Sequence, residues 1–297
     1  MQQIEYIEQD SILSLAEHEA GIDHDISLPT FAGHEALTVR TGVSVGRGEG
    51  VSVYGIDTGI YIDHECFRGR ALFGASFVDE TDGESDKNGH GTHTAATAVG
   101  EVYGLATASN IIAVKVLDGS GSGATSGVIQ GVCWVSKHFK DNGMKPSIAT
   151  MSLGGPPSPA LNHVVKSAIN LGIHFTVAAG NSNQPADTSS PANVEAANTI
   201  GAVDKGNNKA EFSNYGQLID VWALGVDVKS AWIGSPDAEN TISGTSMATP
   251  HVAGILAVAI SNHGNKSPKE LSDDLKAHAK PVVTGAILSN NLLATKW

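Results

Sequence analysis

Val51-Ser-Val-Tyr-Gly-Ile-Asp57-Thr-Gly59 is an apolar run that ends in an acidic residue and a turn. The run is typical of a buried strand over 51–56, with Asp57 at its carboxyl end. Four more apolar runs of similar length predict further strands, at 111–117, 147–152, 174–178 and 199–203. Strands with few polar interruptions indicate a sheet that is covered on both faces.

Helical patterns fill the intervals between these runs, at about 91–99, 125–140, 159–171, 246–262 and 268–279. Alternating strands and helices imply parallel pairing through right-handed crossovers. We therefore predict an α/β fold with three layers, α/β/α, around a mostly parallel central sheet. A strand-like piece is also predicted from Ile4 to Ile12, and a surface loop over 181–193.

The composition is that of a folded, acidic protein. Of the 297 residues, 41% are hydrophobic and 16% are charged, which argues against a disordered chain. The formal net charge is -13 and no run of Lys and Arg occurs, so nucleic acid is not expected as a partner. The negative charge favours solubility and a monomeric state.

Neither a membrane span nor a signal peptide is expected in this chain. The longest apolar stretch, around Val252 to Ile260, is too short to cross a bilayer. Residues 1–5, Met-Gln-Gln-Ile-Glu, show neither the basic nor the apolar part of a secretory leader. The two cysteines, Cys66 and Cys133, leave one bridge or two free thiols open.

Polar segments stand at predicted strand ends and helix starts. Asp57 follows the first strand, where sites form in open α/β sheets, although an isolated Asp-Thr-Gly is usually a turn. Asn88-Gly-His90-Gly-Thr-His93 opens a helix. Its two histidines also suit a metal pair, but the Glu of a His-Glu-x-x-His motif is missing.

The segment Ser243-Gly-Thr-Ser246-Met-Ala-Thr-Pro-His-Val-Ala-Gly254 places Ser246 where glycine gives way to a helix. A serine there is often only a helix N-cap. The same position offers free N–H groups and positive potential, which stabilise a developing oxyanion. Val177-Ala-Ala-Gly-Asn181 lies at another strand end, so the Asn181 amide is placed to complete an oxyanion hole.

Together these segments supply the parts of a nucleophilic site. A serine hydroxyl needs a base, histidine supplies one near neutral pH, and a carboxylate must hold the imidazole tautomer. The chain order Asp57, His90, Ser246 is one of the known triad orders. The sequence therefore predicts a Ser-His-Asp triad.

These segments resemble those of subtilisin-like serine proteases, the peptidase S8 family. Two further stretches, 114–123 and 212–216, are similar to the proteinase K group, particularly its fungal members, and the resemblance covers roughly residues 48–297. It implies a subtilisin-like fold and a serine endopeptidase that hydrolyses proteins or peptides through an acyl-enzyme. No cofactor is implied for the chemistry itself.

The resemblance assigns a role to each matching residue. Asp57 would orient His90, which would act as general base and then as general acid. Ser246 would attack the peptide carbonyl, and Asn181 would donate to the oxyanion.

The resemblance also implies two walls that hold the substrate as an added strand. The residues of these walls are Gly121, Ser122 and Gly123 on one side and Ser152, Leu153, Gly154 and Gly155 on the other. Apolar, glycine-rich walls at 153–155 and 178–180 suggest a roomy S1 pocket and broad specificity with an apolar or aromatic P1 residue. Asp187 is expected in solvent, and Thr125 stands where relatives often carry an aromatic lid over S4.

A structural calcium ion is a further implication of the resemblance. Asp220 matches a ligating carboxylate, and the carbonyl groups of Glu195 and Ala197 match its backbone partners. Calcium takes six to eight oxygens, and only one anionic ligand is assignable here. The alternative, that Asp220 is an ordinary strand-edge or turn acid, stays open.

Residues 4–11, Ile-Glu-Tyr-Ile-Glu-Gln-Asp-Ser, resemble the tail of the inhibitory propeptide of fungal subtilases. We therefore expect a remnant of an inhibitor I9-type propeptide over 1–20 and a peptidase S8 catalytic domain over 21–297. In a longer precursor the propeptide would act as inhibitor and folding chaperone. The resemblance implies a secreted enzyme made as a zymogen, with the vacuole as the alternative location.

Three other functions remain open on the same residues. A non-catalytic relative would bind peptides without cleaving them, and a peptide ligase would share the acyl-enzyme but transfer it to an amine. A metal hydrolase would use His90 and His93 as ligands.

Overall fold

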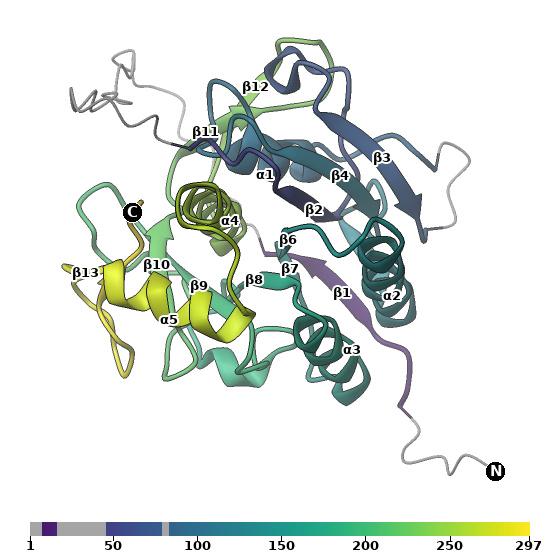
Figure 1. Ribbon diagram of the computed structural model, residues 1–297. Coiled ribbons are helices and arrows are strands. Elements are labelled where there is room, and N and C mark those ends of the chain that lie inside the picture. The colour runs from purple at the N-terminus through teal and green to yellow at the C-terminus, as the bar shows by residue number, and fades with distance from the viewer. Residues whose placement is uncertain (1–7, 17–45, 79–82) are drawn as a thin grey trace, which may run out of the picture.

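A mostly parallel sheet of nine strands runs through the described part of the protein (Figure 1). The computed structural model describes residues 8–16, 46–78 and 83–297. The strand order is β13-β14-β10-β9-β8-β6-β2-β4-β3, and every neighbouring pair is parallel except β13 and β14. The strands of this sheet are β2 (Ser52–Asp57), β3 (Ala71–Ser76), β4 (Asn110–Lys115), β6 (Ser147–Met151), β8 (His174–Ala178), β9 (Asn198–Val203), β10 (Val221–Leu224), β13 (Lys280–Pro281) and β14 (Leu292–Leu293). The predicted fold class is confirmed.

The helices lie where the sequence patterns place them. They are α1 (His90–Val99), α2 (Thr125–Asp141), α3 (Pro159–Asn170), α4 (Thr245–His263) and α5 (Pro268–His278), with short 3-10 turns η1 (Glu65–Phe67) and η2 (Ala186–Thr188). Local signals fix several of their starts. Ser267 and Glu270 form a capping box at α5, and Pro159 follows the Ser158 N-cap at α3.

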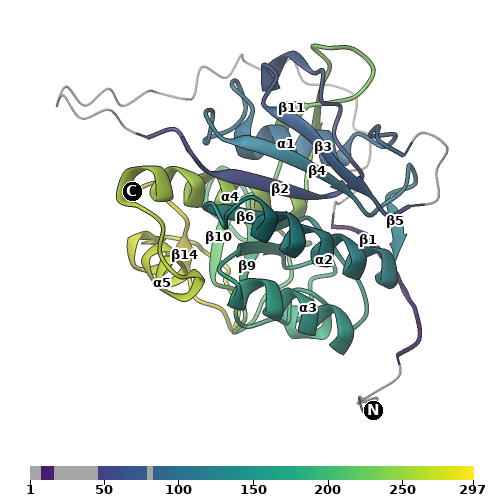
Figure 2. The same cartoon turned by 45° about the vertical axis from the view of Figure 1, so that its right-hand side comes forward.

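Alternate residues of the central strand β2 face opposite layers. Val53 belongs to the buried cluster that α1 and α4 share with one face of the sheet. Tyr54 and Ile56 belong to the cluster that α2 and α3 cover on the other face. Figure 2 shows α2 and α3 together on one side of the strands. A strand buried on both faces needs apolar residues at nearly every position, and this explains the run that β2 carries.

The order of the strands reverses next to β2, where β4 and β6 are its two neighbours. Such a switch point opens a crevice beyond the carboxyl ends of the strands. Asp57 ends β2, Ser152 follows β6, and Asn181 lies three residues after the end of β8. The topology thus brings the polar strand ends to one edge of the sheet.

An N-terminal strand joins a second, small sheet at this edge. Strand β1 (Ile12–Leu15) lies between β5 (Ser122–Ala124) and β7 (Leu153–Gly154), antiparallel to both. The sequence predicts a strand from Ile4 to Ile12, but residues 1–7 lie outside the described part and the observed strand begins at Ile12. A two-stranded antiparallel sheet is formed by β11 (Val228–Ala231) and β12 (Glu239–Ile242).

The two cysteines are unpaired thiols. Cys66 is buried and Cys133 is exposed, and no disulfide joins them. Of the two alternatives that the sequence left open, the structure has two free thiols. Burial raises the pKa of the Cys66 thiol to about 12, which keeps it protonated and unreactive. Among the described residues no helix has both the length and the apolarity that a membrane crossing requires.

Candidate active site

Asp57 and His90 are joined by a buried hydrogen bond. His90 Nδ1 lies 2.8 Å from Asp57 Oδ1, and neither side chain is more than 3% exposed. Because a carboxylate only accepts, the Nδ1 position must carry the proton. The backbone N–H of Thr58 also donates to Asp57 Oδ1, at 2.7 Å. The imidazole is therefore held in the tautomer that leaves Nε2 as the basic nitrogen.

The second histidine of the motif has a different environment. His93 Nε2 lies 3.0 Å from the carbonyl oxygen of Val228 on β11, and its ring packs edge-on against Trp232. Burial, together with the neighbouring His90, lowers the pKa of His93 to about 3. The His90 ring contacts the end of β2, whereas the His93 ring contacts β11 and Trp232. His93 is therefore a neutral residue that packs in the interior. No cluster of three or more His, Cys, Asp or Glu side chains suited to a metal occurs in the described ranges.

Ser246 lies in the first turn of the buried helix α4. Its hydroxyl donates to the carbonyl oxygen of Ser152 at 3.0 Å, and the Ser152 hydroxyl donates back to the Ser246 carbonyl at 2.8 Å. A hydroxyl has one hydrogen, so that hydrogen must turn from Ser152 to the imidazole before His90 can accept it. The chain thus brings Asp57, His90 and Ser246 to the same end of the sheet from β2, α1 and α4.

The Asn181 amide is oriented by its neighbour Thr245. Asn181 Oδ1 accepts from the Thr245 N–H at 3.0 Å and from the Thr245 hydroxyl at 2.8 Å. These bonds fix which way the amide points. The Asn181 Nδ2 atom is buried and makes no hydrogen bond within the described structure. A buried donor without an acceptor is costly, and an oxyanion supplies the missing acceptor.

Strand β1 occupies the cleft in the manner of a substrate. The Ser246 N–H donates to the Ala16 carbonyl oxygen at 3.0 Å. The Ala16 N–H donates to the Ser152 carbonyl at 3.2 Å, and the Leu15 N–H donates to the Gly121 carbonyl at 3.2 Å. The carbonyl oxygen of Ala16, just after the strand, therefore accepts from a backbone N–H at the start of α4.

The walls expected from the sequence flank this strand on both sides. Leu13 and Ser14 are opposite Gly123 and Ser122, and Ser14 and Leu15 are opposite Gly154 and Leu153. The Leu13 side chain is 1% exposed and belongs to the α2–α3 core cluster. The Thr125 hydroxyl donates to the Ser11 carbonyl at 2.9 Å, so this residue contacts the strand directly.

A cavity of about 430 Å³ opens next to the Ala16 side chain. None of the described residues that line it is charged. They are Ser14, Leu15, Ala16, Gly154, Gly155, Pro156, Ala178, Gly180, Asn181, Ser182, Gln184, Thr188, Ser189 and Asn214. Asp187 is exposed and is not among the lining residues. The methyl group of Ala16 fills little of this space.

Two carboxylates anchor the residues before β1 to helix starts. Asp10 accepts from the Ser126 N–H at 3.0 Å and from its hydroxyl at 2.6 Å, in the first turn of α2. These hydrogen bonds lower the pKa of Asp10 below its ordinary value. Glu8 accepts from the Ala160 N–H at 3.0 Å and from the Ser158 hydroxyl, at the start of α3. Negative charge at a helix N-terminus is stabilising, so both contacts favour the bound strand.

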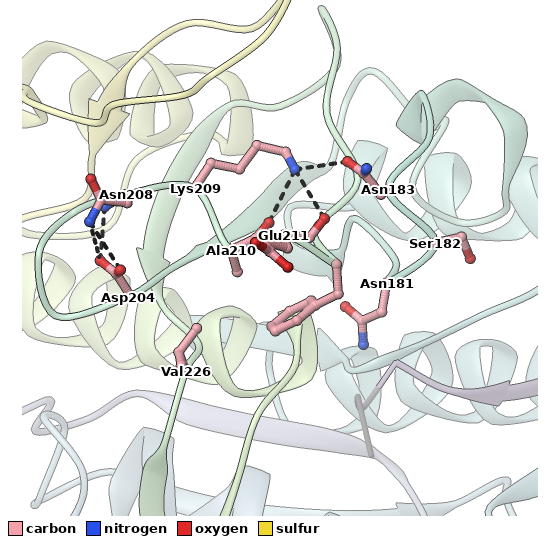
Figure 3. A pocket seen from close by; sticks show the side chains of 10 residues that line it. Asn181, Ser182, Asn183, Asp204, Asn208, Lys209, Ala210, Glu211 and Val226 are labelled. Atoms are coloured by element: carbon pink, nitrogen blue, oxygen red, sulfur yellow. Dashed lines mark hydrogen bonds between the residues drawn. The ribbon is translucent and has the colours of Figure 1, made fainter. Parts of the chain in front are cut away.

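A second cavity, of about 700 Å³, also borders Asn181, and no residue of β1 lines it (Figure 3). The Asn208 amide donates to the Asp204 carboxylate at one side of this cavity, away from Asn181. The Lys209 ammonium donates to Asn183 Oδ1 at 3.0 Å, and burial lowers its pKa. That ammonium already donates to acceptors of the protein. The polar groups of the cavity that are left for a ligand are therefore mainly carboxylates and amides.

The residues proposed for calcium make other contacts. Asp220 Oδ1 lies 3.0 Å from the Lys276 ammonium, and Asp220 Oδ2 accepts from the Thr199 N–H at 2.9 Å. Burial raises the pKa of the Asp220 carboxyl, and the Thr199 hydrogen bond and the ammonium oppose that rise. The single anionic group that Glu195 and Ala197 would complement is therefore already neutralised by a cation. Paired in this way, the Asp220 carboxylate does not fit a bound calcium ion.

The subtilase family model matches residues 48–292 of this chain. The chain belongs to the subtilase family. It is 52% identical over 228 residues to "Subtilisin-like protease 2" of Pseudogymnoascus destructans, which covers 77% of this chain and 56% of that protein. It is 42% identical to a "Cuticle-degrading serine protease" of Arthrobotrys oligospora, over 97% of this chain and 70% of the relative. The subtilase thus spans about half to two thirds of the length of these relatives.

A solved subtilase structure has the same architecture. The crystal structure of a cold adapted subtilisin-like serine proteinase superposes with a TM-score of 0.81 at 44% identity, and the match covers 87% of this subtilase and 93% of that chain. The predicted membership of a fungal, proteinase K-like group of serine proteases is confirmed.

The sequence left several participating residues unrecognised. Asp86 is a buried carboxylate that accepts from the backbone N–H groups of Asn88, Gly89 and Thr92, around His90. No sequence motif predicts such backbone partners. Glu8 and Asp10 were expected only in a propeptide-like tail, and their helix-capping contacts depend on a fold that is remote in sequence. One sequence signal for these contacts exists. The two acids stand at alternate positions just before an apolar strand.

Proposed function

We propose that this chain is a serine endopeptidase in which Asp57, His90 and Ser246 form the triad and Asn181 completes the oxyanion hole. The hydrogen bond that His90 Nδ1–H donates to Asp57 fixes the His90 tautomer. The helix start that carries Ser246 presents a backbone N–H to the substrate carbonyl. These two contacts support the roles that general acid–base and nucleophilic catalysis would require of His90 and Ser246.

The reaction follows in two half-reactions. His90 Nε2 takes the proton of the Ser246 hydroxyl as Oγ bonds to the peptide carbonyl carbon, and the carbonyl oxygen becomes an oxyanion. The Ser246 N–H and the Asn181 amide stabilise that oxyanion. When the C–N bond breaks, His90 gives its proton to the leaving amine, and an acyl-enzyme remains. Water, deprotonated by His90, then hydrolyses the ester and restores the serine.

One observation carries this proposal. The protein's own residues 12–16 lie in the cleft as an antiparallel strand, with the Ala16 carbonyl at 3.0 Å from the Ser246 N–H. A peptide that bound only for recognition would not need its carbonyl at a helix start beside a buried Ser-His-Asp group. This arrangement supports the proposal that a substrate binds in the same way before attack.

The position of Ala16 defines the subsites. Counted back from its carbonyl, Ala16 is P1 and Leu13 is P4. The size of the cavity beside Ala16, and the apolar and glycine residues at 154–156, 178 and 180 in its wall, support a preference for a large apolar or aromatic P1 residue. The buried Leu13 side chain supports an apolar P4 residue. The cavity that Lys209 and Asn181 share would receive residues on the leaving side of the bond.

The bond between Ala16 and Glu17 is the one that this geometry presents for cleavage within the same molecule. Until it is cut, residues 8–16 cover the cleft, and afterwards they act as a bound product. This supports a boundary near residue 16 between an inhibitory segment and a catalytic domain, close to the expected 1–20 and 21–297. The propeptide role of a longer precursor is consistent with it.

The physiological substrates are proteins outside the cytosol. One relative is named for the degradation of cuticle, which supports a secreted enzyme, with the vacuole as the alternative. The net charge of -13 favours a soluble monomer in either compartment.

Labelling with a fluorophosphonate tests the assignment of the nucleophile. The purified full chain is incubated with the reagent, and mass spectrometry locates the adduct. Because β1 covers Ser246, a Leu13→Asp variant, which places a charge in an apolar pocket, should loosen the strand and label faster.

An adduct on Ser246 that is absent from Ser246→Ala establishes the nucleophile. Absence of an adduct from both the folded parent chain and Leu13→Asp would contradict the proposed triad and favour a peptide-binding role.

A further inference from the structure

Asp86 is a buried carboxylate that takes part in no step of the mechanism above. It is 7% exposed and precedes His90 by four positions. A buried carboxylate is retained only where its oxygens are fully hydrogen-bonded or paired.

Five donors fill the two oxygens of Asp86. Oδ1 accepts from the Thr58 hydroxyl at 2.9 Å and from the backbone N–H groups of Asn88 and Gly89 at 3.0 and 2.9 Å. Oδ2 accepts from the Thr92 N–H at 2.9 Å and from the Thr92 hydroxyl at 2.6 Å. The Thr92 hydroxyl bond, at 2.6 Å, has the short length of a charge-assisted hydrogen bond. The other four, at 2.9 to 3.0 Å, have ordinary lengths.

The donors come from two segments that carry different members of the triad. Thr58 follows Asp57 directly at the end of β2, whereas Thr92 lies two residues after His90 in α1. Asp86 therefore ties the turn after the catalytic carboxylate to the helix start that bears the base. The Thr58 hydroxyl extends the tie, since it also accepts from the Gly91 N–H at 2.9 Å.

The two segments lie in backbone contact where Asp86 joins them. A Cβ atom added at Gly91 would lie 2.1 Å from the carbonyl oxygen of Gly59, so only glycine permits this approach. Helix α1 begins after Gly89, which has no side chain to cap the free N–H groups of the first turn. Asp86 supplies that cap from outside the helix, at the third position of α1.

We propose that Asp86 is a positioning residue for the triad, which sets the Asp57–His90 hydrogen bond by clamping the end of β2 to the start of α1. The proposal rests on the proposed peptidase function. It requires that the residue act through geometry, because Asp86 touches neither the substrate strand nor the reacting atoms in the described structure. A displacement of about 1 Å in such a site costs about 10²-fold in rate.

Kinetics of two Asp86 variants test the proposal on the full chain after self-cleavage. Asp86→Ala removes both acceptors, and we expect kcat to fall about 10²-fold while KM changes less than about threefold. Asp86→Asn keeps one acceptor oxygen and should recover part of kcat. Ser267→Ala, which removes the N-cap of α5, is the matched control. It should lower the melting temperature and leave kcat and KM unchanged.

A wild-type kcat in Asp86→Ala, or a rise in KM without a fall in kcat, would overturn the proposal. If Asp86→Ala does not fold, the same two readouts on Asp86→Asn decide the question.

Proton NMR separates this proposal from the peptidase proposal. In the inert Ser246→Ala background, a ring N–H proton that is shared between His90 and a carboxylate should resonate far downfield of the amide region. We expect Asp86→Ala to remove or shift that resonance, and Ser267→Ala to leave it in place. An unchanged resonance would refute the positioning role even if the enzyme is active. A chain that never hydrolyses peptides but loses the resonance would refute only the peptidase function.

Discussion

The Ser246 N–H donates to the Ala16 carbonyl oxygen at 3.0 Å, although the two residues come from opposite ends of the chain. That bond places a carbonyl of the protein at the residue that we propose as its nucleophile. The same bond sets the numbering of the proposed subsites, because the chain runs along the cleft in a known direction from Ile12 to Ala16. Helix-capping contacts from Glu8 and Asp10 hold the start of the same segment.

Replacing Asn181 with alanine should lower kcat and leave KM nearly unchanged. The Asn181 Nδ2 donor is buried and without an acceptor in the described structure, so its hydrogen bond forms only when an oxyanion develops. The size of the loss is known for the oxyanion-hole asparagine of subtilisin, about 10²- to 10³-fold in kcat. Steady-state kinetics on a peptide substrate measure it. A rise in KM at constant kcat would show that Asn181 only binds substrate.

Peptides with a large apolar P1 residue should be cleaved faster than peptides with alanine. Each buried methylene contributes about 0.8 kcal/mol, so leucine should exceed alanine by about 10- to 100-fold in kcat/KM. Gly154→Val should reverse the preference. Its Cβ meets only the Ser190 carbonyl, at 3.5 Å, and its side chain would narrow the cavity. Equal rates for alanine and leucine in the parent enzyme would contradict the S1 assignment.

The free energy of unfolding should fall as the pH is lowered from about 6.5 to about 3. Burial lowers the pKa of His93 to about 3, so in this window the unfolded chain binds a proton that the folded chain refuses. The contribution of His93 is complete above the unfolded pKa and decreases by about 1.4 kcal/mol per pH unit below it. Urea denaturation of the Ser246→Ala protein measures this slope without self-digestion.

His93→Gln is the control for this slope, since its amide does not titrate and offers an N–H to the Val228 carbonyl. Carboxylates such as Asp10 also titrate at the acid end, and this variant leaves them unchanged. The same slope in both proteins would exclude His93 as its source.

Removal of calcium should leave the melting temperature of the parent protein unchanged. The Lys276 ammonium already lies 3.0 Å from Asp220, where a cation would otherwise be needed. Lys276→Met should lower the melting temperature, because it leaves a buried carboxylate unpaired, and added calcium should then restore part of the loss. Differential scanning calorimetry with and without a chelator gives both results. A large fall in the melting temperature of the parent protein on adding the chelator would contradict this prediction and support a calcium ion at Asp220.

The core of the fold could be predicted because its signals are local. The apolar runs of β2, β4, β6, β8 and β9 and all five helices lie within two residues of their expected ends. In contrast, β1 forms its hydrogen bonds with strand edges that are more than a hundred positions away. Nothing within Ile12 to Leu15 specifies those partners, so the expected strand was placed too early.

The parts of the site differ in the same way. Asp57, His90 and Ser246 stand in local sequence motifs, and the fold brings them to the same end of the sheet. Asp86 is bonded mainly to backbone N–H groups, and its importance depends on the approach of β2 to α1. The resemblance implies that Asp220 is a calcium ligand, and the sequence does not reveal that a lysine of α5 lies close to its carboxylate.

The intact mass of the purified chain tests the central claim most directly. The parent protein and Ser246→Ala are expressed together under the same conditions, and the N-terminus of each is read by mass spectrometry. We expect the parent chain to begin at Glu17, with residues 1–16 present as a separate peptide, and Ser246→Ala to remain whole. An uncut parent chain that is folded, or an equal cut in Ser246→Ala, would contradict the claim that Ser246 attacks the carbonyl that β1 presents.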